Sequence, residues 1–448
     1  MFRKDSLKIE EWLKKSNKAL LVTGARQIGK TWLIRDEISK NGFNKFEINF
    51  IDQPDMVDYL SADISVEEFL VKLKMIMPEN CKPHETIVFF DEIQKCPEIV
   101  TKIKFLVDEG SFKYIMSGSL LGVELRGIAS VPVGYLSILR MYPMDFEEFM
   151  IANNVSNVTL EMLKQNYETR TPIDEFIHKK LLSLYFVYLI VGGMPDAVKT
   201  YVDTKDIREV DRIQKDITTL YKEDFSQYEQ EDKKLKLKSI YEIIPAELNK
   251  QNKKFVFTML DKELKFNRYE NSFLWLKDAG VVIPVYNADS PKIPLLASKS
   301  SNVFRLFSSD IGLLTSAYPA ETKFALINKN GEVNNGAHFE NAVAQQLCVN
   351  GFEPYFHKKK NIGEIDFLIE MNGKVVPIEV KSGKSYKIHK ALDNLLKIED
   401  YHIEHAYVFS IGNVEVDGLI TYLPIYMSYL LKETEINEMI LDLDLSGL

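Results

Sequence analysis

Cysteine is scarce in this sequence. Its three cysteines, Cys81, Cys96 and Cys348, are scattered, and none has the spacing of metal ligands. A cysteine-based metal site is therefore not expected. So few thiols are typical of a protein in a reducing compartment, where cysteine mostly serves as a small buried apolar residue. We expect a cytoplasmic protein.

Long hydrophobic runs are also missing. The longest apolar stretch that could suggest a membrane segment, Leu181–Val191, is too short to cross a bilayer and stops at Gly192-Gly193. It predicts a core helix instead. No apolar stretch follows the charges of Met1–Asp5, so we expect neither a signal peptide nor a membrane partner.

An excess of positive charge is absent. The formal net charge of −9 at pH 7 argues against a broadly basic surface that coats nucleic acid, although it leaves room for a local basic groove. With 46% hydrophobic and 27% charged residues, the composition is that of a soluble globular protein. At 448 residues the chain is too long for one ordinary core, so two or three domains are expected.

The most informative stretch that is present begins at Ala19. A short apolar run, typical of a buried parallel strand, ends at Gly24, and the pattern GxxxxGK[ST] then leads into a helix-compatible segment. Glycines let backbone N–H groups curl around phosphate oxygens, and the helix N-terminus adds its positive end. The residues expected to bind a nucleotide are Gly24, Ala25, Arg26, Gln27, Ile28, Gly29, Lys30 and Thr31.

Two further predicted strands end in polar residues that suit the same site. Lys30 would reach the β- and γ-phosphates, and the Thr31 hydroxyl would ligate Mg²⁺. A buried strand beginning at Thr86 ends in Asp91 and Glu92, at the tip where parallel sheets hold ligands. Asp91 would help to hold Mg²⁺, and Glu92 would polarise the attacking water. Ser117, at the end of the next strand, would sense the γ-phosphate.

These motifs resemble those of AAA-type P-loop ATPases. More narrowly, they resemble a bacterial and archaeal group (AAA_14/DUF4143-like) in which such an ATPase precedes a C-terminal region of uncharacterised function. The resemblance implies ATP with Mg²⁺ as ligands and leaves a homo-oligomer open. Its landmarks are Gly24–Thr31, Asp91–Gln94, Ser117–Ser119, Tyr142–Phe149 and Gly192–Pro195.

One landmark of that group is missing. The group often carries Gly-Arg shortly before the Tyr-Pro segment, whereas here the glycine is followed by Tyr135. The arginine that stabilises charge in the transition state is therefore unassigned. Arg126 and Arg140 are the local candidates, and we place Arg126 first among the catalytic residues. A solvated surface arginine is the equally good alternative for each.

Helical patterns dominate the middle of the chain. Residues from Asp174 to Leu248 show apolar positions at helix spacing, which favours a packed helical lid over a site. A helix, a short element at Phe257–Leu260, a second helix at Arg268–Ala279 and a strand at Val281–Tyr286 then suggest a winged helix. The second helix carries few basic residues, so packing between domains is favoured over insertion into a DNA groove.

The C-terminal part holds a second constellation of polar residues. Glu340 lies one turn into a predicted helix, and Asp366 points away from its neighbours on a predicted strand. Asn372-Gly373 is a strong hairpin signal that leads into a partner strand. Because side chains alternate along a strand, Glu379 and Lys381 share one face.

A helix Glu, a strand Asp and a Glu-x-Lys strand resemble the PD-(D/E)xK nuclease fold. The resemblance implies Mg²⁺ or Mn²⁺ bound by Asp366, Glu379 and Glu340, with Lys381 positioning the hydrolytic water. A divalent metal is a natural reason to gather carboxylates that would otherwise repel one another. Lys358–Lys360 would meet the phosphate backbone of DNA or RNA. Ile365 replaces the proline of the strict motif, and a degenerate nuclease fold kept for assembly is the alternative.

The sequence therefore predicts an α/β protein in four parts. These are an AAA-type P-loop ATPase domain (1–150), a helical lid (151–232), a winged-helix-like domain (233–330) and a restriction-endonuclease-like α/β domain (331–448). The expected function is an ATPase cycle that controls a metal-dependent nuclease-like domain acting on nucleic acid. The alternative is a nucleotide-driven switch or scaffold whose C-terminal domain is catalytically silent. The sequence gives neither the substrate nor the pathway.

Overall fold

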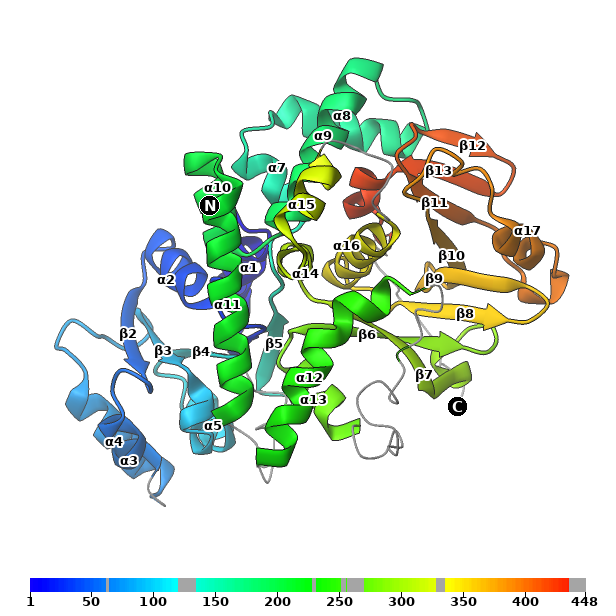
Figure 1. Ribbon diagram of the computed structural model, residues 1–448. Helices are drawn as coiled ribbons and strands as arrows, with labels where there is room; N and C mark the ends of the chain where they lie inside the picture. Colours follow the sequence, from blue (N-terminus) through cyan, green and yellow to red (C-terminus); the bar gives the residue numbers. More distant parts are fainter. Residues whose placement is uncertain are drawn as a thin grey trace, which may run out of the picture.

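Two β-sheets organise the protein, with helices between and around them (Figure 1). The computed structural model describes residues 1–61, 64–119, 134–227, 231–250, 255, 270–327 and 335–434. Arg126 and the short element predicted at Phe257–Leu260 lie outside this range. None of the described helices is both long enough and apolar enough to cross a membrane.

The first sheet has five parallel strands in the order β2-β3-β4-β1-β5. Helices cover both of its faces, so the N-terminal module has three layers. Its strands are β1 (Ala19–Thr23), β2 (Asn44–Asn49), β3 (Thr86–Asp91), β4 (Lys113–Gly118) and β5 (Leu136–Arg140). Its helices are α1 (Asp5–Lys15), α2 (Lys30–Lys40), α3 (Asp55–Ser61), α4 (Val66–Ile76) and α5 (Glu98–Glu109), and the short turn η1 (Ile93–Lys95) follows β3.

Alternation along β1 explains the continuous apolar run that marked this strand in the sequence. Leu20 and Val22 pack toward α1 and α2, whereas Leu21 packs toward α3, α4 and α5. Both faces are buried, so every position in the strand is apolar or nearly so. The helix predicted to begin after Ser65 is α4, and Ser65 forms a capping box with Glu68.

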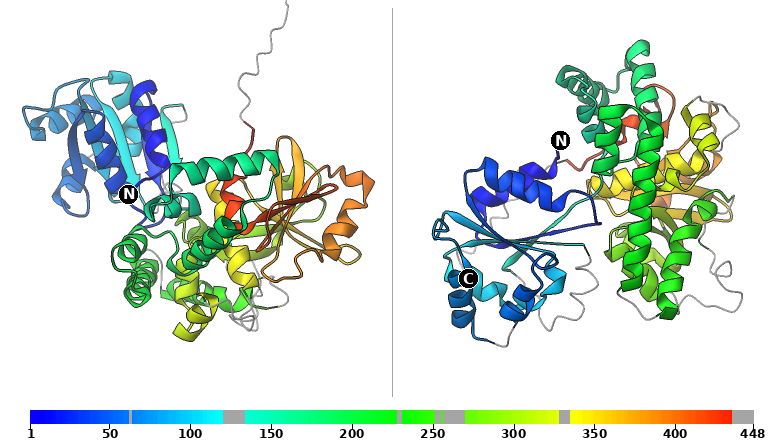
Figure 2. Two further views of the ribbon diagram at one scale, coloured as in Figure 1. Left: turned by 90° about the horizontal axis from the view of Figure 1, so that it is seen from above. Right: turned by 60° about the vertical axis from the view of Figure 1, so that its left-hand side comes forward.

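Helices fill the space between the two sheets. The predicted core helix at Leu181–Val191 is the second half of α9 and is largely buried. The helices of this region are α7 (Phe146–Ala152), α8 (Asn157–Thr169), α9 (Glu175–Val191), α10 (Pro195–Thr204), α11 (Ile207–Gln227), α12 (Glu231–Leu248) and α13 (Glu270–Asp278). Figure 2 shows α11 running between the two lobes of the molecule.

The second sheet has eight strands in the order β12-β13-β11-β10-β9-β8-β6-β7. Its strands are β6 (Val282–Ala288), β7 (Lys299–Ser308), β8 (Tyr355–Lys359), β9 (Gly363–Met371), β10 (Lys374–Val380), β11 (Ala406–Ser410), β12 (Glu415–Asp417) and β13 (Ile420–Pro424). Its helices and turns are α14 (Ile311–Ser316), α15 (Ala320–Ile327), α16 (Gly336–Val349), α17 (Lys390–Leu396), η5 (Leu295–Ser298), η6 (Glu399–Tyr401) and η7 (Ile425–Leu430).

This sheet extends across residue 330, where the sequence suggested a domain boundary. The strand expected at Val281–Tyr286 is β6, which pairs antiparallel with β7 and also parallel with β8. Local alternation in a strand does not reveal its pairing partner, because that partner lies far along the chain. The strands expected to form a wing are therefore continuous with the C-terminal sheet.

The C-terminal elements begin in the order helix, three strands, helix and strand. The Asn372-Gly373 turn joins β9 to β10 as expected, with both residues at positive φ. Helix α16 covers one face of the sheet and α17 the other. The apolar core on the α16 face continues through α9 to helices α1 and α2 of the first sheet, so the two lobes share one core.

Candidate functional site

The loop between β1 and α2 turns sharply at its two glycines. Gly24 has φ of 140°, and a Cβ added there would lie 2.4 Å from the carbonyl oxygen of Met141. Gly29 has φ of 89° and caps the N-terminus of α2. Side chains rarely tolerate these conformations, so glycine is required for the backbone to curl here. The loop thus presents the N-terminus of α2 to the cavity described below.

Lys30 is folded back onto this loop. Its Nζ donates to the carbonyl oxygens of Ala25 at 2.8 Å and Gly24 at 3.0 Å. Burial lowers the pKa of Lys30 to about 8, although the carboxylates of Glu92 and Asp91 act in the opposite direction. An anionic ligand held by the loop would favour the charged ammonium further.

Asp91 stands at the tip of β3 among hydrogen-bond donors. Its carboxylate accepts from Thr31 Oγ1 at 3.1 and 3.2 Å, from Asn49 Nδ2 at 3.1 Å and from the Ser117 hydroxyl. A hydroxyl and a carboxylate side by side are ligands that Mg²⁺ takes together with phosphate oxygens. These residues fit a magnesium ion bound with a nucleotide. Ser117 is fully buried at the end of β4.

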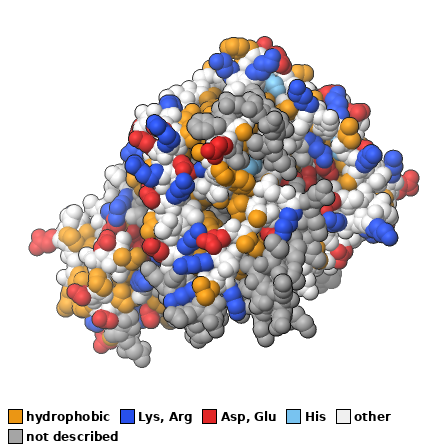
Figure 3. Space-filling model, viewed as in Figure 1, with side chains coloured by type: hydrophobic (Ala, Val, Ile, Leu, Met, Phe, Trp, Pro, Cys, Tyr) orange, Lys and Arg blue, Asp and Glu red, His pale blue; other side chains and the backbone are white. Residues whose placement is uncertain are grey.

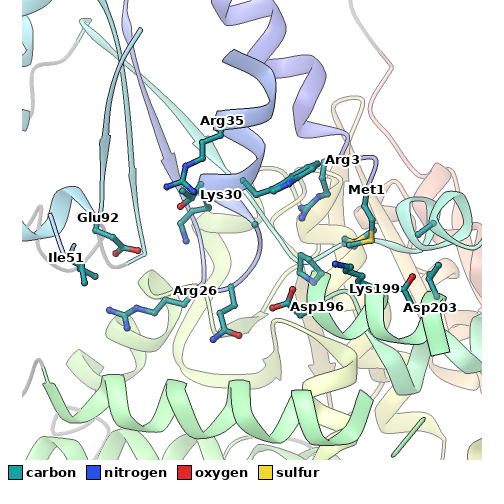
Figure 4. Close-up of a pocket in the computed structure, with 18 residues that line it drawn as sticks. Met1, Arg3, Arg26, Lys30, Arg35, Ile51, Glu92, Asp196, Lys199 and Asp203 are labelled. Atoms are coloured by element: carbon teal, nitrogen blue, oxygen red, sulfur yellow. The ribbon is translucent and has the colours of Figure 1, made fainter. Parts of the chain in front are cut away.

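Glu92 follows Asp91 in a left-handed conformation, with φ of 56°. Its carboxylate accepts from Gln94 Nε2 and borders the same cavity as Lys30. Arg26 lies across from Glu92 (Figure 4) and forms an ion pair of 2.5 Å with Asp224 of α11. Helix α11 therefore touches the loop directly.

A cavity of about 800 Å³ opens at the loop, a size suited to a nucleotide. One end is bordered by the loop and Glu92, and the other end mixes apolar with charged side chains. Helix α10 closes that end, and the N-terminal segment lines it as well (Figure 4). The apolar residues that line the cavity are Met1, Trp32, Ile51, Met144, Ala152, Pro195 and Val202.

Sequence reasoning missed the residues that α10 contributes. Asp196, Lys199 and Asp203 line the cavity and face the loop from the opposite side (Figure 4). The glycine pair before Pro195 predicted where this helix begins, but nothing in the sequence indicated that it would lie over the loop. Arg3 was missed as well, and its buried guanidinium donates to the carbonyl oxygen of Ile28 at 2.8 Å.

Of the two candidate arginines, only Arg140 falls within the described residues, and it does not line this cavity. Arg126 lies outside the part of the chain that the structure describes. Arg140 is exposed at the end of β5 and donates to the carbonyl oxygen of Lys277 at 3.0 Å. It borders a separate cavity between the lobes, together with Cys348 and Glu353.

The second constellation assembles on the hairpin of β9 and β10. Ile378 lies opposite Phe367, which brings Glu379 next to Asp366. Asp366 accepts from the backbone N–H of Val380 at 2.9 Å, and Lys381 Nζ lies 2.8 Å from Glu379 Oε2. Burial, reinforced by the charge of Asp366, raises the pKa of Glu379 to about 8.

Arg305 of β7 joins these carboxylates. Its Nη1 lies 3.7 Å from Glu340 Oε2 and 3.8 Å from Asp366 Oδ1, and its Nη2 pairs with Glu364. Among the described residues, no three His, Cys, Asp or Glu side chains are grouped so as to hold a metal ion. Two of the three proposed ligands, Glu340 and Asp366, therefore do not fit a shared divalent metal, because a guanidinium already faces them both, and the third, Glu379, pairs with Lys381.

Family models match three parts of the chain. Residues 16–150 match the AAA domain family AAA_14. Residues 182–323 and 335–427 match two domains of unknown function, DUF8612 and DUF4143. The AAA_14 and DUF4143 parts of the predicted resemblance are confirmed, whereas the likeness to a nuclease fold is not shown. No curated protein matches the chain.

Several solved structures are similar over much of the chain. The Walker-type ATPase PABY2304 of Pyrococcus abyssi is 15% identical with a TM-score of 0.42, covering 70% of this chain and 95% of its own. The Thermotoga maritima RuvB Holliday junction branch migration motor is 17% identical with a TM-score of 0.28, and the match covers 66% of this chain and 91% of its own. DnaA from Aquifex aeolicus, bound to AMPPCP, is 11% identical with a TM-score of 0.31, and the match covers 62% of this chain and 89% of its own.

These likenesses are too weak to say what the chain binds or assembles with. The AAA match and the local geometry agree with each other. The N-terminal module is an AAA-type P-loop domain, and the protein is an ATPase.

Proposed function

We propose that this ATPase is a nucleotide-driven switch in the cytoplasm, whose ATP cycle moves α10 against the loop and whose C-terminal domain binds a partner without cleaving it. Lys30 contacts the β- and γ-phosphates, Thr31 and Asp91 hold Mg²⁺, and Glu92 polarises the attacking water. Ser117 detects the γ-phosphate through its hydrogen bond to Asp91. Mg²⁺, bound with ATP, neutralises charge on the transferring phosphoryl group.

One contact carries the proposal of a switch. Helix α10, which closes the nucleotide cavity, begins just after Gly193, and the Gly193 N–H donates to Asp310 Oδ2 at 2.7 Å. Asp310 is fully buried between β7 and α14 of the second sheet. Any movement of α10 toward a bound nucleotide therefore acts on the start of α14 and the end of β7.

A second set of contacts supports the same coupling from the other side of the loop. Arg3, which binds the loop at Ile28, also forms an ion pair of 3.2 Å with Glu148. The neighbouring Lys4 pairs with Asp145 at 2.5 Å, and Gln346 of α16 donates to Asp145 at 3.3 Å. A buried polar network thus extends from the nucleotide loop to the helix that carries the C-terminal carboxylate Glu340.

Hydrogen exchange tests the switch. The Glu92→Gln protein, which retains ATP, is compared with and without ATP over Lys299–Ser316, the segment of β7 and α14. Exchange in this segment should change on ATP addition, while the Lys30→Ala protein, which lacks the phosphate-binding charge, should show no change. Equal exchange with and without ATP in the Glu92→Gln protein would rule out this route of coupling.

A metal-dependent nuclease acting on DNA or RNA is the second candidate. The proximity of Asp366, Glu379 and Lys381 favours it, as does the series Lys358–Lys360 at the end of β8. The position of Arg305 disfavours it, and basic and acidic side chains are interspersed on the face in Figure 3. Cleavage of single- or double-stranded substrates with Mn²⁺, abolished by Asp366→Asn, would establish the nuclease and reject the silent domain.

The arginine that completes the ATPase site is proposed to come from a second copy of the chain in a homo-oligomer. Arg140 faces Lys277 rather than the nucleotide cavity, which supports an action outside its own protomer. Arg126 remains the other candidate. Neutralising charge in the transition state is what such a residue supplies.

A further inference from the structure

We propose that the C-terminal carboxylate cluster is built around an internal cation: the Arg305 guanidinium takes the position that a divalent metal ion would need, and this chain binds no metal there. The inference deepens the C-terminal half of the proposed function, whose domain binds without cleaving. It stands whether or not the ATPase cycle reaches the cluster.

The guanidinium contacts carboxylates from two elements at once. Nη1 lies 3.7 Å from Glu340 on α16 and 3.8 Å from the side chain of Asp366 on β9, and it donates to the Asp366 carbonyl at 3.4 Å. Nη2 pairs with Glu364 at the start of β9. One nitrogen atom thus faces two of the three carboxylates that the metal hypothesis needed to share an ion, and the third, Glu379, pairs with Lys381.

Arg305 is fixed in this position. Its side chain is 1% exposed, and the guanidinium lies over the ring of Phe356, 4.6 Å from the centroid. An arginine stays charged at any ordinary pH, so it can be buried here only because the carboxylates compensate it. A divalent ion would have to lie about 2 Å from oxygens of Glu340 and Asp366, beside a second, immobile positive charge.

The charges of the cluster already nearly balance. Glu340, Glu364 and Asp366 supply three negative side chains, and Arg305, Lys358 and Lys381 supply three positive ones. Glu379, whose pKa is raised to about 8, is largely protonated at neutral pH. Lys358 pairs with Glu364 at 2.6 Å. The repulsion among carboxylates that suggested a metal is therefore relieved by the protein itself.

Manganese binding to the full chain without nucleotide tests the inference. Titration calorimetry and the Mn²⁺ paramagnetic resonance signal are compared between the wild type and Asp366→Asn, which share the same P-loop site. Their Mn²⁺ binding should be equal. Arg305→Met, which keeps the apolar stem of the side chain and removes the guanidinium with its charge, should gain Mn²⁺ affinity by about tenfold or more. Adding Asp366→Asn to this variant should remove the gain, and Arg305→Lys should not show it.

Two outcomes would overturn the inference. One is Mn²⁺ bound by the wild type and lost in Asp366→Asn; the other is an Arg305→Met protein that folds and gains no Mn²⁺ site. If Arg305→Met does not fold, melting with and without EDTA decides. If EDTA lowers the melting temperature of the wild type but not that of Asp366→Asn, the inference is contradicted. If EDTA changes neither melting temperature, the inference is supported. None of these measurements depends on ATP, so they are independent of the test of the switch.

Discussion

Gly193, just ahead of α10, and Asp310, between β7 and α14, are joined by a buried hydrogen bond of 2.7 Å, from a backbone N–H to a carboxylate. Gly193 precedes the helix that closes the nucleotide cavity, and the Asp310 side chain also caps α14 by accepting from Leu313 N at 2.9 Å. The helix that closes the nucleotide cavity is thus connected to the start of α14, beside the second sheet. The first two predictions concern this junction.

Gly193→Ala should destabilise the protein strongly. A Cβ at this position would lie 1.9 Å from the Met144 carbonyl oxygen, which leaves no room without backbone movement. We expect the free energy of unfolding to fall by about 3 kcal/mol or more, measured by denaturant titration. Gly383→Ala is the matched control, because its Cβ would meet nothing within 4 Å, and it should change stability by less than about 0.5 kcal/mol. Equal losses of unfolding free energy in the two variants would contradict the close approach of Gly193 to Met144.

Asp310→Asn should flatten the dependence of stability on pH. Burial raises the pKa of Asp310 from 3.8 to about 6, so the folded protein holds this proton more tightly than the unfolded chain. The free energy of unfolding should therefore decrease as pH rises from about 4 to about 6, by about 2 kcal/mol from this group. Denaturant titrations across this range on both proteins measure the effect. Identical pH slopes would show that Asp310 does not titrate in this range.

Lys30→Ala should abolish ATP binding, because it removes the charge that faces the β- and γ-phosphates. Glu92→Gln should retain binding and reduce hydrolysis by about a hundredfold or more, because only the polarisation of water is lost. Titration calorimetry and phosphate release measure the two effects. Hydrolysis at the wild-type rate in Glu92→Gln would remove this residue from its proposed role.

Lys199→Ala should weaken ATP binding by about tenfold, the effect of losing one charge-assisted hydrogen bond to the nucleotide. Lys199 borders the nucleotide cavity from α10. Lys205→Ala is the control, because Lys205 ends the same helix and donates instead to Asn153 at 3.1 Å. A dissociation constant unchanged in both variants would mean that α10 does not contact the nucleotide.

Mixing inactive variants should reveal the missing arginine. If Arg126 acts on the ATP of a neighbouring chain, an Arg126→Ala protein mixed with a Lys30→Ala protein should recover part of the ATPase activity. The same experiment with Arg140→Ala distinguishes the two candidates. Wild-type hydrolysis in both single arginine variants, without any recovery on mixing, would reject an arginine supplied in trans from either position.

Local patterns predicted the parts of this protein that depend on neighbouring residues. The glycine loop, the acidic tip of β3 and the Asn372-Gly373 hairpin each follow from conformations that a few adjacent residues impose. Lys381 meets Glu379 because alternate positions on a strand share a face. These predictions needed no knowledge of the rest of the fold.

Contacts between distant segments could not be predicted in the same way. Arg305 lies in β7 ahead of the predicted C-terminal domain, and only the pairing of β6 with β8 brings it to the carboxylates. A signal did exist, because an arginine between Phe304 and Leu306 in an apolar strand must find a counter-charge if it is buried. The sequence of α10 gave no such signal that this helix would lie over the nucleotide loop.

The pairing of β6 with β8 also decides where the chain can be divided. A fragment of residues 331–448 would begin inside the sheet and leave β8 with a row of unpaired N–H and C=O groups along one edge. Such an edge pairs readily with other chains, so this fragment should aggregate. It would also lose Arg305 and leave the acidic cluster with only Lys358 and Lys381 as counter-charges. A fragment that starts ahead of β6 keeps β8 paired and retains Arg305. It is the smallest piece from which the C-terminal half can be studied alone.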